Sequence, residues 1–168
     1  MRREVLVRPF VADDAAAVST VIATTMRQSN AQDYPGERLE ALIAYFTAEK
    51  LRALAAEREC LVAESAGEVI ATAAREGDEL ATFFVLPVWQ GRGVGTRLLE
   101  QLERSARERG LEQLRVDASV TGATFYEHHG YRRTGAVLAG TAGPQITLMK
   151  DISRRLANEH GFFPQEGV

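Results

Sequence analysis

A short glycine-rich segment between a strand and a helix places the strongest constraint on how this chain folds. Residues 80–85 before it are mostly apolar and predict a strand, and residues 93–109 after it repeat apolar side chains at helical spacing. Small residues let the backbone approach a ligand closely, and the start of a helix offers unpaired N–H groups and a positive dipole. The junction therefore predicts a cradle for phosphate. The segment reads Val85-Leu86-Pro87-Val88-Trp89-Gln90-Gly91-Arg92-Gly93-Val94-Gly95-Thr96.

Three kinds of phosphate-binding turn carry glycines in such a place, and the spacing excludes two of them. A Walker A loop counted from Gly91 would need its second glycine and its lysine where the chain has Thr96 and Arg97. A dinucleotide-binding G-x-G-x-x-G turn would also need glycine at position 96, and it belongs in the first strand–helix–strand unit. The spacing that remains is Gln90-x-x-Gly93-x-Gly95. Tight packing without any ligand is the structural alternative.

A second motif follows one helix and one strand later. A small polar residue, Ser119, comes directly after the predicted strand. A short helix is then expected from Gly122 to His129, closed by Gly130. This helix and its end carry Phe125-Tyr126-Glu127 and Gly130-Tyr131.

The two segments together resemble the GCN5-related N-acetyltransferase (GNAT) family. The first matches the family's pyrophosphate-binding motif, Q/R-x-x-G-x-G/A, and the second matches its later motif, F-Y-E-x-x-G-F/Y. Ser119 stands where many members carry asparagine, which weakens one expected hydrogen bond to the coenzyme arm. The resemblance covers roughly residues 61–150, and the first 60 residues match only in outline.

The resemblance implies that acetyl-CoA is the cosubstrate. The N–H groups of residues 91–96 would hold the pyrophosphate, and residues 83–85 would line the pantetheine arm. A backbone N–H near Val85 would polarise the thioester carbonyl, in an oxyanion-hole role. The residues expected to bind the coenzyme are Phe84, Val85, Gln90, Gly91, Arg92, Gly93, Val94, Gly95, Thr96, Ser119 and Tyr126.

The resemblance also implies direct transfer of the acetyl group to an amine. Tyr126 is expected to donate to the leaving thiolate, and a core aromatic role is its structural alternative. An alkyl amine with a pKa of about 10.4 is almost fully protonated near neutral pH, so a base or a water chain must take its proton. In some relatives a glutamate at the offset of Glu79 is that base; the alternative is a solvated turn carboxylate. Asp117 and Glu127 are weaker candidates.

The periodicity of the chain predicts the order β-α-α-β-β-β-α-β-α-β-β. This order indicates an α+β fold: a mixed, mostly antiparallel central sheet with helices on both faces and one parallel pair across residues 80–116. Asp13 or Asp14 is expected to cap the first helix, and Thr47 a further turn or two after the second. We expect one acetyltransferase-like domain over residues 1–151 and a C-terminal tail over residues 152–168.

Composition excludes several classes of protein. The 168 residues are 45% hydrophobic and 26% charged, as in soluble globular domains, and the net charge of −3 argues against a nucleic-acid partner. No apolar run approaches the roughly 20 residues of a membrane span, and Val5–Val7 is too short for a signal-peptide core. A single cysteine, Cys60, excludes a disulfide framework, and adjacent His128 and His129 do not make a metal site. A cytoplasmic protein without a metal or a membrane partner is therefore expected.

The leading prediction is an acetyl-CoA-dependent N-acetyltransferase acting on a small-molecule or peptide amine. A non-catalytic acyl-CoA-binding sensor or regulatory module is the first alternative, and a structural or dimerisation protein that kept the fold is the second. Tyr126 argues against the former and the intact glycine-rich turn against the latter. The acceptor pocket is expected from Thr24–Phe46 and Val137–Gly143, where no strongly acidic wall indicates a polyamine or an aminoglycoside. A homodimer is left open.

Overall fold

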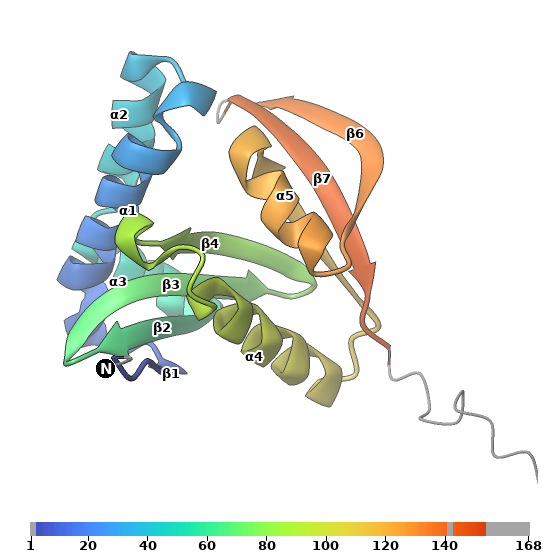
Figure 1. Ribbon diagram of the computed structural model, residues 1–168, viewed down its shortest axis with the longest axis horizontal. Coiled ribbons are helices and arrows are strands. Elements are labelled where there is room, and N and C mark those ends of the chain that lie inside the picture. Colours follow the sequence, from blue (N-terminus) through green and yellow to red (C-terminus); the bar gives the residue numbers. More distant parts are fainter. Residues whose placement is uncertain (1–2, 141–142, 154–168) are drawn as a thin grey trace, which may run out of the picture.

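Seven strands form one mixed sheet in the computed structural model, which describes residues 3–140 and 143–153 (Figure 1). The strand order is β1-β2-β3-β4-β5-β7-β6. Neighbours pair antiparallel, except that β4 and β5 run parallel and are joined by a helix. The strands are β1 (Leu6–Pro9), β2 (Glu59–Ser65), β3 (Glu68–Glu76), β4 (Glu79–Val85), β5 (Gln113–Ser119), β6 (Arg132–Gly140) and β7 (Gly143–Asp151).

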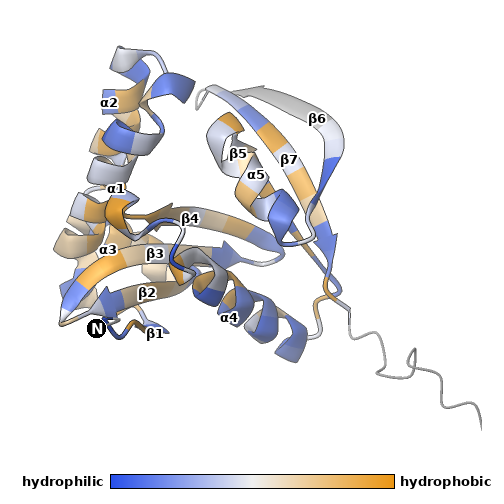
Figure 2. Cartoon of the chain, in the orientation of Figure 1, coloured by the Kyte–Doolittle hydropathy of each residue, from blue (hydrophilic) through white to orange (hydrophobic). Residues whose placement is uncertain are grey.

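Helices cover both faces of this sheet, as the sequence predicts. One apolar cluster joins α1, α2 and α3 to one face, and a larger cluster joins α4 and α5 to the other (Figures 1 and 2). The side chains of β2 alternate between them, since Val62 belongs to the first cluster and Leu61 and Ala63 belong to the second. The helices are α1 (Ala15–Ser29), α2 (Gly36–Tyr45), α3 (Ala48–Glu57), α4 (Val94–Glu108) and α5 (Val120–His128), with short 3₁₀ turns η1 (Ala12–Asp14), η2 (Ala31–Asp33) and η3 (Pro87–Trp89).

The α+β fold is confirmed, and the first half of the chain holds one more full helix than the predicted order. Thr47 does cap a helix, since its hydroxyl accepts from the Lys50 N–H at 3.1 Å, but the helix that follows is ten residues long. Leu51 of this helix packs in the apolar cluster beside α1, and this tertiary contact stabilises a longer helix than the local sequence predicts.

The predicted cap of the first helix is right in its position and wrong in its hydrogen bond. Asp14 is the N-cap residue of α1, but its side chain makes no cap hydrogen bond to that helix. The Asp14 carboxylate instead accepts from the Val11 N–H at 2.8 Å and forms an ion pair with Arg8 at 2.8 Å. Arg8 also holds the pKa of Asp14 below its usual range, because the hydrogen bond and the positive charge favour the ionised carboxyl.

The second half of the chain follows the prediction with longer elements. The strand expected at residues 114–116 extends over Gln113–Ser119, and α5 begins at Val120 rather than at Gly122. Ile152, the first residue of the predicted tail, is 1% exposed, and its N–H donates to the Glu112 carbonyl at 2.8 Å. The rest of the predicted tail, from residue 154 onward, lies outside the described residues. Within the described part of the chain, none of the helices has the length and hydrophobicity needed to span a membrane.

Candidate active site

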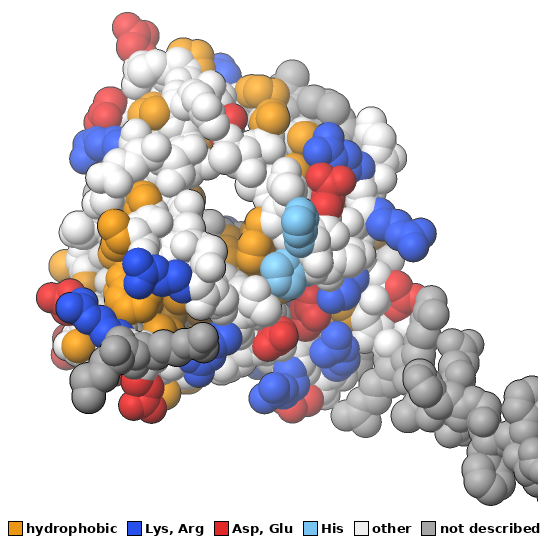
Figure 3. All heavy atoms as spheres, in the orientation of Figure 1, with side chains coloured by type: hydrophobic (Ala, Val, Ile, Leu, Met, Phe, Trp, Pro, Cys, Tyr) orange, Lys and Arg blue, Asp and Glu red, His pale blue; other side chains and the backbone are white. Residues whose placement is uncertain are grey.

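The central feature of the molecule is a split in the sheet between β4 and β5. These strands pair only at Glu79 with Arg115 and at Leu80 with Val116, although each is seven residues long. Beyond that point they diverge, and a cavity of about 550 Å³ lies between them. Figure 3 shows an opening near the centre of the molecule, with hydrophobic side chains along its lower edge. The volume is within the range of small-molecule binding sites.

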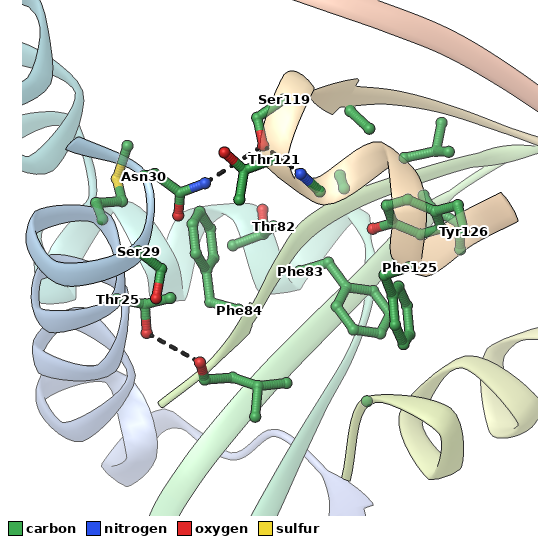
Figure 4. Close-up of a pocket in the computed structure, with 18 of the residues that line it drawn as sticks. Thr25, Ser29, Asn30, Thr82, Phe83, Phe84, Ser119, Thr121, Phe125 and Tyr126 are labelled. Carbon is green, nitrogen blue, oxygen red and sulfur yellow. Dashed lines mark hydrogen bonds between the residues drawn. The ribbon is translucent and has the colours of Figure 1, made fainter. Parts of the chain in front are cut away.

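A distortion in β4 shapes both walls of this cavity. Thr82 has a φ of +49°, in the left-handed region that a β-branched residue rarely adopts, and the pairing of β3 with β4 shifts register beside it. Phe83 then packs in the cluster under α4 and α5, whereas Phe84 packs in the cluster under α1 to α3. Figure 4 shows the two rings pointing to opposite sides of the strand. Such strain costs on the order of 1–3 kcal/mol and is typical of functional sites.

The glycine-rich segment ends at the open mouth of the cavity. Gly91 and Gly93 have φ values of +70° and +82°, and no atom lies within 4 Å of the place where a Cβ would stand on either residue. Gly93 is the N-cap of α4 and provides no side-chain cap, so the first N–H groups of a 15-residue helix have no side-chain partner there. This open, electropositive backbone fits the pyrophosphate of a coenzyme.

Two side chains expected at the coenzyme already have partners within the chain. The Gln90 amide donates to the Val85 carbonyl at 2.9 Å and to the Ser29 hydroxyl at 3.1 Å, which ties the end of β4 to α1. Arg92 is exposed, and its guanidinium lies 5.4 Å from the centre of the Trp89 ring. These contacts position the turn, and direct binding of the coenzyme by Gln90 and Arg92 stays a prediction.

The opposite wall of the cavity is formed by α5 and its cap. The Ser119 hydroxyl accepts from the Gly122 N–H at 3.1 Å and from the Asn30 amide at 3.3 Å. Since both bonds use the oxygen as an acceptor, its own proton is available to a ligand.

The helix α5 presents the Tyr126 hydroxyl to the cavity, in addition to Thr121 near its start. Tyr126 is 5% exposed, and its ring packs edge-on against Phe83 and Tyr131 at 5.8 and 5.6 Å. Figure 4 shows the hydroxyl pointing into the cavity. Burial raises the pKa of Tyr126 well above its usual value, so the phenol stays protonated and can donate.

His129 is a residue whose contacts the sequence did not reveal. Its Nδ1 lies 2.7 Å from the Phe125 carbonyl and its Nε2 lies 2.9 Å from the Thr96 hydroxyl. The imidazole therefore links the helix of Tyr126 to the first turn of α4. In the sequence, His129 stands four residues after Phe125, which predicts that the two are neighbours on one helix face. Its second contact, with Thr96 of α4, can be found only in the fold.

The carboxylates lie differently from what the sequence indicated. Glu79 begins β4, is half-buried and is not among the residues that line the cavity. Asp117 is the one carboxylate in the described lining, and both its oxygens are engaged: the Arg115 guanidinium donates at 2.6 Å and the Thr147 hydroxyl at 2.7 Å. Burial alone would raise the pKa of Asp117, but these two hydrogen bonds outweigh it and lower the pKa. The structure therefore brings Tyr126 to the cavity but not Glu79, whose role as a base stays a prediction.

The single cysteine lies apart from this site. Cys60 lines a separate small cavity with residues of β3 and α3, and burial raises the pKa of its thiol. A neutral, half-buried thiol is a poor nucleophile, and the residues around Cys60 do not include His129. Among the described residues there is no group of three or more His, Cys, Asp or Glu side chains that could hold a metal ion.

Comparison with known proteins identifies the kind of domain. Residues 30–159 match a family model described as an acetyltransferase (GNAT) domain. A crystal structure from Rhodopseudomonas palustris, named as a GCN5-related N-acetyltransferase and as a class-II aminotransferase, is 29% identical, with a TM-score of 0.81 over 90% of this chain and 98% of that one.

Two more distant structures share the fold. A PaiA N-acetyltransferase from Thermoplasma acidophilum, in complex with coenzyme A, has a TM-score of 0.79 at 18% identity over 88% of this chain and 99% of that one. An aminoglycoside 6′-N-acetyltransferase complexed with coenzyme A has a TM-score of 0.65 at 18% identity over 90% and 99% of the two chains. A search of curated protein sequences found no significant match.

Proposed function

The chain belongs to the GNAT acetyltransferase family, and from this premise we propose that it transfers an acetyl group from acetyl-CoA directly to the amine of an acceptor molecule. One observation carries the proposal. The cavity between β4 and β5 reaches the glycine cradle at one side and α1 and α2 at the other, and the Tyr126 hydroxyl points into it between them. Coenzyme and acceptor can therefore meet at one phenol without a covalent enzyme intermediate.

The coenzyme would bind along the diverging edge of β4. Its pyrophosphate would accept hydrogen bonds from N–H groups of residues 91–96, at the positive end of α4. Its pantetheine arm would run along the backbone of Phe84 and Val85 and reach Ser119, since β5 does not pair with that part of β4. The arm would thus take the place of a strand in the split of the sheet.

The transfer step then needs two proton movements. The neutral amine attacks the thioester carbonyl carbon, and a backbone N–H near Val85 stabilises the oxyanion. The intermediate collapses with breakage of the C–S bond, so the products are an N-acetyl amide and coenzyme A. The sulfur takes its proton from Tyr126, which regains one from solvent, and the amine gives its proton to a base.

The raised pKa of Tyr126 determines how this residue assists the departure of the thiolate. A thiol has a pKa of about 8.5, so its anion is already a good leaving group. Because the phenol is the weaker acid, it helps chiefly as a hydrogen-bond donor while negative charge grows on the sulfur. The thiolate gains the proton of Tyr126 only as solvent returns a proton to the phenol.

We assign the base to Glu79 acting through water. Glu79 precedes Leu80, which lines the cavity, so a short water chain would be needed to span the gap. Asp117 is a poor alternative because Arg115 and Thr147 already occupy its carboxylate. The lack of a free carboxylate in the described lining is also the observation that favours the second candidate, an acyl-CoA-binding module without turnover.

Two measurements test the proposal. Isothermal titration of the protein with acetyl-CoA and with coenzyme A should give low-micromolar binding for both. Release of free thiol from acetyl-CoA should then depend on an added primary amine. No binding at millimolar coenzyme would overturn both candidates, whereas binding without amine-dependent thiol release would favour the binding module.

A further inference from the structure

We propose that the acceptor is a small monoamine that carries one aromatic ring or an apolar group of similar size, bound between β4 and the α1–α2 helices. This inference rests on the proposed function, because it names the substrate class of that same cavity. It excludes polycationic amines and the lysine side chains of extended peptides.

The two faces of the sheet divide the cavity between coenzyme and acceptor. The cradle begins α4, and Gly95 lies against Phe125 so closely that a Cβ would stand 3.1 Å from its ring. A coenzyme anchored there enters on the α4–α5 side, next to Phe83. The acceptor must then reach the thioester from the other face, where Phe84 points toward α1 (Figure 4).

The lining on that other face is mainly apolar and aromatic. The Phe46 and Phe84 rings are edge-on with centroids 6.2 Å apart, which offers a ring-sized ligand an aromatic surface. Burial raises the pKa of Tyr34, so its phenol is neutral as well. The apolar and aromatic side chains of this wall are Met26, Tyr34, Leu42, Phe46 and Phe84.

Charge in the cavity argues against an acceptor with several amines. Each ammonium group that leaves water needs a compensating partner, or its burial is costly. The one carboxylate in the described lining, Asp117, is already paired with Arg115 at 2.6 Å. A monoamine escapes this cost, since its single nitrogen must lose a proton before it attacks.

Contacts across the acceptor face argue against a peptide. The connection after α1 meets α5 through the Gln32 amide, which lies 3.1 Å from the Thr121 hydroxyl. The same connection brings Tyr34 against Gly143, where a Cβ would stand 3.1 Å from the ring. With the Asn30–Ser119 hydrogen bond, these contacts bridge α1, α5 and the start of β7. An extended peptide needs an open groove, whereas these contacts close this side of the cavity and leave space for a small molecule.

A panel of three amines tests the inference on the wild-type protein. The probes are 2-phenylethylamine, spermidine and a five-residue peptide with blocked ends and one central lysine, each assayed for thiol release from acetyl-CoA. We expect kcat/KM for 2-phenylethylamine to exceed both others by at least tenfold. Equal or greater kcat/KM for spermidine or the peptide overturns the inference and leaves the proposed function intact.

A pair of variants tests the neutral wall itself. Leu42 lines the cavity from α2, whereas its neighbour Ala41 is exposed and does not. Leu42→Glu should raise the ratio of kcat/KM for spermidine over 2-phenylethylamine by about tenfold, and Ala41→Glu should leave it unchanged. An equal change in both variants, or none in a folded Leu42→Glu protein, contradicts the proposed wall; circular dichroism establishes folding.

Failure of the inference and failure of the proposed function give different results. If acetyl-CoA binds but none of the three amines supports thiol release, transfer to amines is itself wrong and the acceptor class falls with it. If one amine is acetylated and it is not the aromatic one, only the acceptor class is wrong. The wild-type panel decides this even if Leu42→Glu does not fold.

Discussion

The coenzyme side and the acceptor side of the cavity are built in different ways. On the coenzyme side, one continuous segment from Val85 to Thr96 supplies a strand edge, a turn and a helix start, and backbone N–H groups are the expected binding groups. On the acceptor side, side chains from α1, α2, β4 and β7 converge from distant parts of the chain. The hydrogen bond between Asn30 and Ser119, for example, joins residues 89 positions apart.

This difference predicts how each side responds to substitution. A backbone cradle tolerates almost no change at its glycines, because both the φ values and the free space are required. A wall of side chains can change one residue at a time without moving the backbone. Substitutions on the coenzyme side should therefore abolish activity toward every amine, whereas those on the acceptor side should change which amine is preferred.

The largest effect is expected from Gly93→Glu. The carboxylate would occupy the site where the pyrophosphate binds and repel it, and the φ of +82° adds backbone strain of roughly 1–2 kcal/mol. We expect the affinity for acetyl-CoA to fall at least 100-fold in isothermal titration. An unchanged affinity would show that the glycine-rich turn serves packing only.

Gly110→Glu is the matched control for this substitution. Gly110 follows the other end of α4 with a φ of +81°, and its Cβ position is equally open. The variant should lose a similar free energy of unfolding and keep its affinity for acetyl-CoA. A comparable loss of affinity in both variants would assign the effect to backbone strain rather than to the anion.

A smaller effect is expected from Tyr126→Phe. Removal of the hydroxyl takes away the donor to the leaving sulfur and leaves the ring packing against Phe83 in place. We expect kcat to fall about 10- to 100-fold, at the low end for acid catalysis because the thiolate leaves readily, with little change in the Kd of acetyl-CoA.

Tyr131→Phe separates this catalytic effect from loss of packing. The Tyr131 hydroxyl donates to Glu103 at 3.1 Å, and its ring lies 5.6 Å from that of Tyr126. The variant should lose about 1.5–3 kcal/mol of unfolding free energy, because the hydrogen bond is to a charged group, and keep kcat. If both variants lost kcat equally, Tyr126 would act through packing.

The fold could be predicted from the sequence wherever local patterns agree with tertiary packing. The α4 helix shows this, because Leu98, Leu99 and Leu102 repeat at helical spacing and all three are buried. The N-cap position of α1 could be predicted, but the partner of its carboxylate could not, since Asp14 is held by Arg8 of β1. The length of α3 depends on packing under α1, which no local pattern records.

In the candidate site, too, the coenzyme side could largely be predicted from the sequence and the acceptor side could not. The positions of Gly91, Gly95 and Tyr126 in the lining of the cavity follow from motifs of fewer than twenty residues each. The link between His129 and Thr96 joins residues 33 positions apart on different helices, so no local pattern in the sequence could show it. The neutral lining of the acceptor side likewise depends on which charged residues are paired or turned away, which only the fold determines.

The smallest of these effects is expected from Glu79→Gln, which tests whether Glu79 at the start of β4 accepts the proton of the acceptor amine. If a water chain carries the proton to Glu79, the variant should lose up to about tenfold in kcat near neutral pH and recover as pH rises, because more of the amine is then neutral in solution. The rate is measured as thiol release from pH 6 to 10. A pH profile that matches the wild type would remove Glu79 from the mechanism.

Asp117→Asn is the matched control, because Asp117 lines the cavity and yet is committed to Arg115 and Thr147. The pKa of its carboxyl is lowered in the folded protein, so the ionised form stabilises the fold above the ordinary value of 3.8, and this stability is lost as pH falls through the folded pKa. Asp117→Asn should therefore lower the unfolding free energy at neutral pH, and its difference from the wild type should disappear in acid. The shape of the alkaline rate profile should not change. If the pH profile of the rate shifted in Asp117→Asn and not in Glu79→Gln, the base would be Asp117 on β5. The cavity would then hold a catalytic carboxylate, contrary to the neutral acceptor wall inferred above.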